Sequence, residues 1–262
     1  MKLVGLVFSF LVSGLILNSF YTSAHAHNFY QNQDSIFFTL VKRFEIEDTV
    51  ASNSHDTNES NSLHHSENAA NILKRIFFFN NSIASNANFI NTYKPIFDGL
   101  NITTKALVAA DLADESLKEY GLSLGLDVTQ ASSLPNMTMN MGNTMKMGDN
   151  MTVPSGITGQ ALNLASKYVM NQSDFESSAK IAKSLKILFL RSLKNATLDK
   201  SIGLMQIPIE MKRESVKNLE QGIDSLTSAV NRKAPLLEVF RIVHGQIHPN
   251  LFLAYDLKLK GE

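Results

Sequence analysis

Hydrophobic residues recur at spacings of three and four along most of this chain, which is the period of an amphipathic helix. The pattern predicts a first helix that follows the first 26 residues and runs to about residue 53. It predicts further helices at 63–79, 83–100, 102–120, 157–170, 174–193, 212–231 and 235–247. Alternating runs of β-branched residues, which would predict strands, are nearly absent. The predicted fold class is therefore all-α, an antiparallel helical bundle in two halves.

Prolines and glycines set the expected ends of several of these helices. Pro95 limits how far a helix can continue through 83–100. Gly121 or Gly125 is expected to end the helix at 102–120. The last helix is expected to begin with Pro235 in its first turn and to end before Pro249.

Residues 127–156 interrupt the helical pattern. They show neither the helix nor the strand period and are rich in Asn, Gly and Thr, so they predict a flexible insert. The chain then divides into a signal peptide, an N-terminal helical half, the methionine-rich insert and a C-terminal helical half. The boundaries are 1–26, 27–126, 127–156 and 157–262.

The first 26 residues favour export. Lys2 precedes an apolar run from Leu3 to Leu17, and small residues at Ser23, Ala24 and Ala26 suit a signal peptidase. An uncleaved membrane anchor is the alternative, although the run is shorter than the roughly 20 residues of a full span. Cleavage leaves 236 residues, enough to bury a core.

Composition excludes several classes of protein. The chain has no cysteine, so disulfides, zinc fingers and iron–sulfur sites are excluded. Its 24 basic and 24 acidic residues balance, which gives no footprint for nucleic acid or an anionic membrane. The sequence also lacks a G-x-S-x-G elbow and a glycine-rich phosphate loop, so no enzyme class is predicted.

Six of the chain's ten methionines lie in the insert. Each is flanked by polar residues, so core packing does not explain the cluster. A thioether is a soft, uncharged ligand that suits Cu(I), and the cluster therefore predicts copper binding. A plain linker and a sacrificial oxidant sink are the alternatives. The predicted ligands are Met137, Met139, Met141, Met145, Met147 and Met151.

Histidines at the expected amino terminus give a second copper hypothesis. Cleavage after Ala24 exposes His25, and places His27 third, where its imidazole, the amine and two backbone nitrogens suit square-planar Cu(II). Cleavage after Ala26 makes His27 the first residue, whose amine and ring nitrogen can chelate copper as half of a histidine brace. Solvent-exposed histidines without a role are the alternative.

Two further histidine pairs stand out. His244 and His248 share one face of a continuous helix and match metal-ligand spacing, the alternative being helix-terminal histidines bonded to the last carbonyls. No Glu follows His244, which excludes a zinc-protease motif. His64 and His65 point roughly 100° apart on a helix, so they are expected to belong to a solvated helix start.

Seven N-x-S/T sequons make glycosylation of an exported chain plausible, while unused sequons in an Asn-rich chain are the alternative. They begin at Asn58, Asn80, Asn101, Asn136, Asn150, Asn171 and Asn195.

Several stretches resemble a family of exported helical proteins of ammonia-oxidising archaea: DSIFFTLV at 34–41, AADLADE at 109–115, the methionine insert at 136–151 and IVHGQIHPN at 242–250. The resemblance spans most of the mature chain. It implies a cell-surface or pseudoperiplasmic location in organisms that depend on copper, and it implies no particular activity. The absence of histidine from the insert of this chain leaves Cu(I), rather than Cu(II), as the ion expected there.

The resulting expectation is an exported, non-enzymatic protein that captures or buffers copper outside the cytoplasm. The alternative is a glycosylated structural or interaction protein of the cell envelope, whose partners would be other envelope proteins. A copper oxygenase with a brace at His27 is a weaker hypothesis. Contact with the membrane is expected only through an uncleaved signal segment.

Overall fold

The computed structural model describes residues 29–54, 59–79, 89–126, 169–198 and 207–259. All regular secondary structure in these ranges is helical, apart from one isolated bridge between Phe29 and Leu259, which confirms the all-α class. The methionine insert and most of the predicted helix at 157–170 lie outside the described residues.

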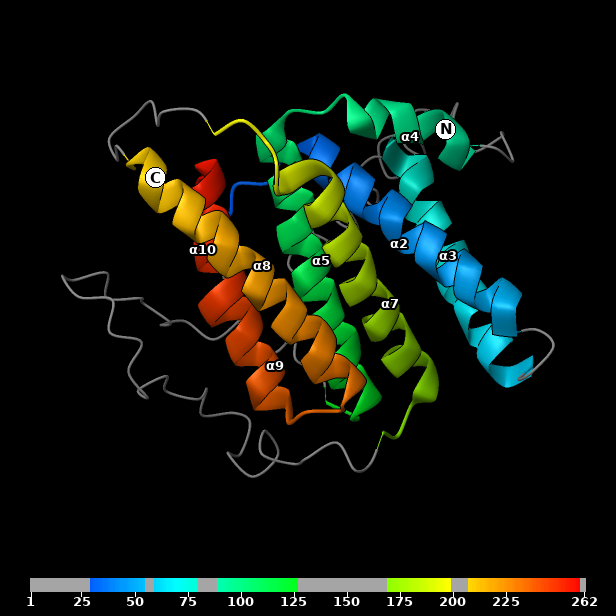
Figure 1. The fold of residues 1–262 in the computed structure, drawn as a ribbon. Helices are drawn as coiled ribbons and strands as arrows, with labels where there is room; N and C mark the ends of the chain where they lie inside the picture. Colours follow the sequence, from blue (N-terminus) through cyan, green and yellow to red (C-terminus); the bar gives the residue numbers. More distant parts are fainter. Residues whose placement is uncertain (1–28, 55–58, 80–88, 127–168, 199–206, 260–262) are drawn as a thin grey trace, which may run out of the picture.

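The helices follow the predicted order along the chain (Figure 1). They are α2 (Gln33–Ser54), α3 (Glu59–Phe79), α4 (Phe89–Asp98), α5 (Ile102–Ser123), α7 (Gln172–Leu188), α8 (Ile209–Asn231), α9 (Leu236–Ile242) and α10 (His248–Tyr255), with two π-helical turns, η1 (Phe189–Leu193) and η2 (Val243–Ile247).

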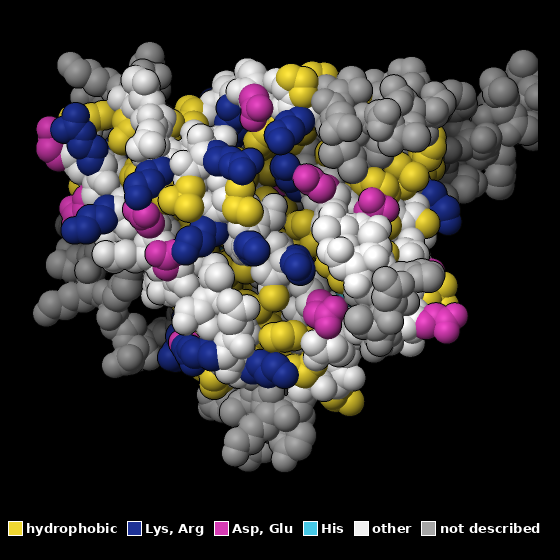
Figure 2. Space-filling view, turned by 45° about the vertical axis from the view of Figure 1, so that its right-hand side comes forward, with side chains coloured by type: hydrophobic (Ala, Val, Ile, Leu, Met, Phe, Trp, Pro, Cys, Tyr) yellow, Lys and Arg dark blue, Asp and Glu magenta, His cyan; other side chains and the backbone are white. Residues whose placement is uncertain are grey.

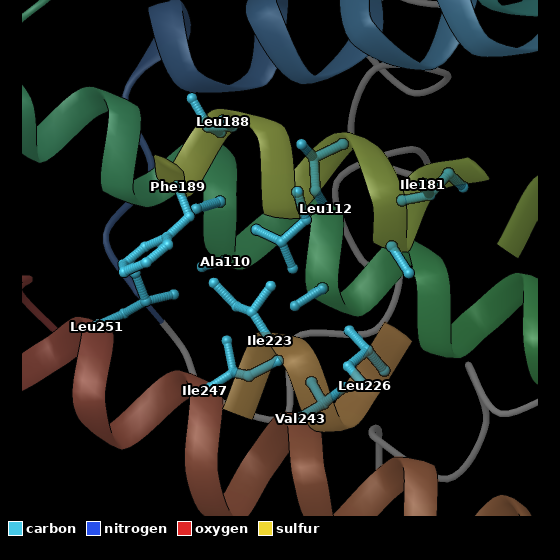
Figure 3. Packing of buried hydrophobic residues seen from close by; sticks show 14 of the residues in the cluster. Ala110, Leu112, Ile181, Leu188, Phe189, Ile223, Leu226, Val243, Ile247 and Leu251 are labelled. Carbon is cyan, nitrogen blue, oxygen red and sulfur yellow. The ribbon is translucent and has the colours of Figure 1, made fainter. Parts of the chain in front are cut away.

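A bundle of α5, α7, α8, α9 and α10 holds the main hydrophobic core. Leu112 of α5, Ile181 of α7 and Leu226 of α8 point into it, together with Val243 and Ile247 of η2 (Figure 3). All five side chains are almost fully buried. Burying a side chain of this size stabilises the fold by about 1.5–3 kcal/mol relative to leaving it exposed. The core therefore draws on helices from both sides of the insert.

Helices α2 and α3 form an antiparallel hairpin beside this bundle (Figure 1). A small second apolar cluster, Leu40, Val41, Ile72 and Ile76, closes the hairpin internally. Polar side chains make much of the contact between the hairpin and the bundle. For example, Thr39 Oγ1 donates to Asp111 of α5 over 3.0 Å, and Ser177 Oγ of α7 donates to Glu47 over 2.8 Å.

The prediction of where the last helix ends was wrong. The helical path does not stop before Pro249 but continues through η2 and α10 to Tyr255. In η2 the N–H of His248 donates to the carbonyl of Val243, five residues earlier. This wider turn places Pro249 in the first turn of α10, where a missing N–H breaks no intrahelical bond.

The structure also shows where the helices near Pro95 and Gly121 end. Pro95 lies inside α4, which ends at Asp98. Gly121 remains within α5, and the chain leaves the helix after Ser123. Gly125 then takes a φ of 73°, a left-handed conformation that favours glycine.

Within the described residues, no helix combines the length and hydropathy needed to cross a membrane. Positive and negative side chains are interspersed over the face shown in Figure 2. This mixture agrees with the balanced composition of the chain.

Candidate metal centre

The π-helical turn η2 brings His244 and His248 together. Their ring centroids are 5.1 Å apart, and the two Nδ1 atoms are separated by 3.4 Å. The prediction that the two histidines share one helical face is therefore confirmed. The alternative of helix-terminal histidines fails, because both lie inside a path that continues to Tyr255.

Asp114 of α5 joins this pair from across the bundle. Its Oδ1 lies 3.2 Å from Nε2 of His248. One ligand atom from each of Asp114, His244 and His248 lies within 4.8 Å of the other two, and within the described ranges this is the one group of three or more such residues with that geometry. We name this group the His–Asp centre. The sequence alone did not single out Asp114 as a site residue, because it lies on another helix far from the histidines along the chain.

The His–Asp centre lies just beneath the protein surface. His248 is completely buried, His244 is 4% exposed, and the side chain of Asp114 is 11% exposed. The edge of the Phe240 ring packs against His244 at 4.3 Å between centroids, and the Phe29 ring packs against His248 at 5.5 Å. These aromatic contacts fix the orientation of both imidazoles and limit the access of water.

The position of Asp114 bears on which nitrogen of His248 carries a proton. A carboxylate beside Nε2 favours a proton on that nitrogen, which leaves a lone pair on Nδ1. Nδ1 of His248 faces Nδ1 of His244, so the two nitrogens can share a proton or bind one cation. Two nitrogens bound tetrahedrally to one ion would be separated by about 3.3 Å, close to the observed 3.4 Å. With a cation bound between the two Nδ1 atoms, Asp114 and His248 would form a carboxylate–histidine–metal arrangement.

The remaining predicted ligands lie outside the described residues. They are His25, His27, Met137, Met139, Met141, Met145, Met147 and Met151. The structure places none of them relative to the His–Asp centre.

A second polar cluster joins the hairpin to the bundle around Arg43 of α2. The guanidinium of Arg43 forms ion pairs with Glu115 and with Glu119 of α5, the latter at 2.7 Å, and lies 3.6 Å from Glu47. Burial alone would lower the pKa of Arg43, but the carboxylates of Glu115, Glu119 and Glu47 raise it above its ordinary value. The guanidinium thus supplies the positive charge that a metal ion would otherwise supply among these carboxylates.

His65 belongs to this cluster, which corrects the expectation of a solvated helix start. Its side chain is fully buried, and Nδ1 lies 2.7 Å from a carboxylate oxygen of Glu47. His64, one residue earlier, is 38% exposed and lies 3.3 Å from Asp174. Adjacent helical positions point in different directions, so the same pair can contain one buried and one exposed histidine. The apolar pattern of α3 did not reveal this because His65 is buried through a polar partner.

Two of the sequons have a structural explanation. The side-chain oxygen of Asn101 accepts from the N–H of Thr104 and caps α5, while that of Asn171 accepts from Ser173 and Asp174 and caps α7. Asparagine is a favoured N-cap residue, and an N-cap asparagine with Ser or Thr two positions later matches the sequon pattern without any need for a glycan.

In comparisons with known proteins, no family model, no curated protein and no solved structure matches the chain.

Proposed function

We propose that this chain is an exported, non-enzymatic metal-binding protein that captures or buffers copper outside the cytoplasm. The observation that supports the proposal is the His–Asp centre. It contains two facing imidazole nitrogens 3.4 Å apart, oriented by a carboxylate and enclosed by aromatic rings. The rest of the proposal rests on the export signal and the methionine insert in the sequence.

Copper is the metal that both types of donor favour. Imidazole binds copper, zinc, iron and nickel, and among divalent ions of this series copper binds most tightly to a given nitrogen site. The thioethers of the insert suit Cu(I). The proposed protein therefore has a structured nitrogen site at His244 and His248 and a thioether site in the insert.

The first test is a Cu(II) titration against a competing chromophoric chelator. We expect His248→Ala and His244→Ala each to weaken binding at the His–Asp centre, and Asp114→Asn to weaken it about 10- to 100-fold because it removes the group that orients His248. His64→Ala is the matched control, since it removes an imidazole that lies near a carboxylate outside this centre. Equal affinity in the wild type and a His244→Ala, His248→Ala double variant would contradict the proposal.

Deletion of residues 136–151 tests the thioether site separately. We expect the deletion to abolish Cu(I) binding while the helical circular dichroism spectrum is retained, because the insert contributes none of the core residues described. Retained Cu(I) affinity in the deleted chain would remove the insert from the proposal and leave the His–Asp centre untouched.

The exposed sequon at Asn195 supports the second candidate function, a glycosylated structural or interaction protein of the cell envelope. Asn195 lies two residues after the end of η1 at Leu193 and is exposed. Mass spectrometry of peptides from the native host tests this candidate. A glycan at Asn195 together with no copper uptake would favour the envelope role over the metal role.

A further inference from the structure

His65 of α3 has a ring nitrogen that the polar cluster around Arg43 does not use. The side chain of His65 is fully buried, and its Nδ1 lies 2.7 Å from Oε2 of Glu47. Among the described residues, the other ring nitrogen, Nε2, is buried and has no hydrogen-bond partner. A buried polar atom of this kind costs free energy unless a proton, a water molecule or an ion satisfies it. The chemistry around Nε2 decides which of these it is.

Glu47 determines which ring nitrogen of His65 carries the proton. Burial raises the pKa of Glu47. A hydrogen bond with His65, the charge of Arg43 and a hydrogen bond from Ser177 outweigh burial and lower the pKa. The ionised carboxylate can only accept hydrogen bonds, and its Oε1 already accepts one from Ser177 Oγ over 2.8 Å. Nδ1 of His65 therefore donates to Glu47, and in the neutral ring the lone pair lies on Nε2.

A second carboxylate, that of Glu176 on α7, faces this lone pair. Oε2 of Glu176 lies 3.9 Å from Nε2 of His65, which is too long for a hydrogen bond. Oε1 of Glu176 accepts a hydrogen bond over 3.0 Å from Gln172, one turn earlier on α7. Two electron-pair donors thus face each other, and each is held by a partner of its own. The group that fits between them is a cation or a donor of hydrogen bonds.

The ligand types and their surroundings favour a metal ion. Imidazole nitrogen and carboxylate oxygen both bind zinc at about 2.0–2.2 Å, which places two ligand atoms about 3.3 Å apart around a tetrahedral ion. The side chain of Glu176 is 32% exposed, so it can rotate to close the difference from 3.9 Å. A bridging water would instead separate the two atoms by about 4.6 Å. A carboxylate on the far nitrogen, as Glu47 provides, is the usual outer partner of a metal-bound imidazole.

A neighbouring histidine shows the contrast with ordinary hydrogen bonding. His64 and Asp174 join the same two helices, and Nε2 of His64 lies 3.3 Å from Oδ1 of Asp174. The same nitrogen lies 3.2 Å from the side-chain amide of Asn68. Nε2 of His64 therefore has partners within hydrogen-bond distance, whereas Nε2 of His65 has none among the described residues.

We propose that His65 and Glu176 bind a divalent cation of the zinc class, which fastens the α2–α3 hairpin to α7. The remaining coordination positions would be filled by water on the exposed side of Glu176. This site uses none of the residues of the His–Asp centre and does not depend on the proposed function. In a chain without cysteine, the ion would supply a cross-link that no disulfide can supply.

The experiment is a Zn(II) titration of the mature chain followed by NMR of the histidine ring nitrogens, which reports each histidine separately. We expect zinc to shift the Nε2 resonance of His65 while Nδ1 keeps its proton. Glu176→Gln should weaken this binding at least about tenfold, since loss of an outer partner alone typically costs about 10- to 100-fold. His64→Ala is the matched control and should leave the binding unchanged. Both altered side chains reach the surface, so circular dichroism should show unchanged helicity.

Three results would overturn the inference. An Nε2 resonance of His65 that does not respond to zinc would leave a water molecule or a proton at that nitrogen. An unchanged zinc response in Glu176→Gln would remove Glu176 as a ligand. An equal loss of binding in His64→Ala would place the ion at the other histidine. None of these results concerns copper binding by His244 and His248, so the proposed function is tested separately.

Discussion

Glu47 and Glu119 lie in the same buried ionic cluster, yet their pKa values shift in opposite directions. Burial raises the pKa of Glu47, but a hydrogen bond from His65, the charge of Arg43 and a hydrogen bond from Ser177 outweigh it, and the net pKa is lowered. Burial also raises the pKa of Glu119, and there the charge of Arg43 is insufficient to reverse the effect. Ionised Glu47 therefore stabilises the fold, whereas ionisation of Glu119 costs stability.

The same substitution at these two positions should have unequal effects. Glu47→Gln removes the carboxylate that pairs with buried His65 and one of the three carboxylates around Arg43. We expect it to lower the free energy of unfolding at pH 7 by about 3 kcal/mol. Glu119→Gln should cost much less, because Arg43 keeps Glu115 and Glu47. Urea denaturation at pH 7 measures both. Equal losses would show that the two carboxylates are energetically equivalent.

The pH dependence of the two variants follows from the same shifts. The folded pKa of Glu47 lies below its ordinary value of 4.5, so its contribution is complete above pH 4.5 and is lost as the pH falls toward the folded value. Glu119 has a raised folded pKa, so its neutral form favours folding at low pH and this advantage is lost as the pH rises through that value. The free energy of unfolding should therefore be measured from pH 4 to pH 7. Relative to the wild type, we expect it to increase for Glu119→Gln and to decrease for Glu47→Gln as the pH rises.

At the scale of helices, two glycines differ in how closely their surroundings are packed. A Cβ on Gly222 of α8 would lie 3.2 Å from Gln246 Cβ and 3.3 Å from Ile247 Cγ1, whereas a Cβ on Gly245 would meet no atom within 4 Å. Both contacts at Gly222 are with η2, the turn between His244 and His248. The absence of a side chain at Gly222 thus lets α8 approach the turn that carries the candidate ligands.

We expect Gly222→Ala to lower the free energy of unfolding by about 1 kcal/mol, since overpacking forces η2 to shift. It should also weaken copper binding, because the shift acts on the residues between the two histidines. Gly245→Ala is the matched control: it is nearer to the histidines in sequence but has room for a methyl group. Thermal unfolding and the Cu(II) titration measure both variants. A weaker site in Gly245→Ala, with no change in Gly222→Ala, would contradict this packing argument.

Helix positions were predictable from periodicity, but the departures from regular helix were not. The expected helices at 102–120 and 212–231 correspond closely to α5 and α8, because their apolar positions repeat with the helical period. The π-helical turns η1 and η2 depend on packing between helices, which no local pattern encodes. The prediction that Pro249 ends the last helix failed for this reason.

At the scale of the whole molecule, the candidate site combines one local relationship with one long-range relationship. The four-residue spacing of His244 and His248 was sufficient to predict a shared face. Asp114 lies 134 residues before His248 and reaches it only because α5 packs beside η2 and α10 in the main core. The burial of His65 is similar, since it depends on Glu47 of the neighbouring helix. A sequence pattern records which residues share one helix, whereas these contacts depend on how separate helices pack.

The most direct test of the central claim is anomalous X-ray diffraction from crystals of the copper-loaded mature protein, measured on both sides of the copper absorption edge. The account predicts one strong peak between Nδ1 of His244 and Nδ1 of His248, about 2 Å from each, with Asp114 beside the other nitrogen of His248. A fully loaded crystal whose copper peaks all lie away from these two imidazoles would contradict the account.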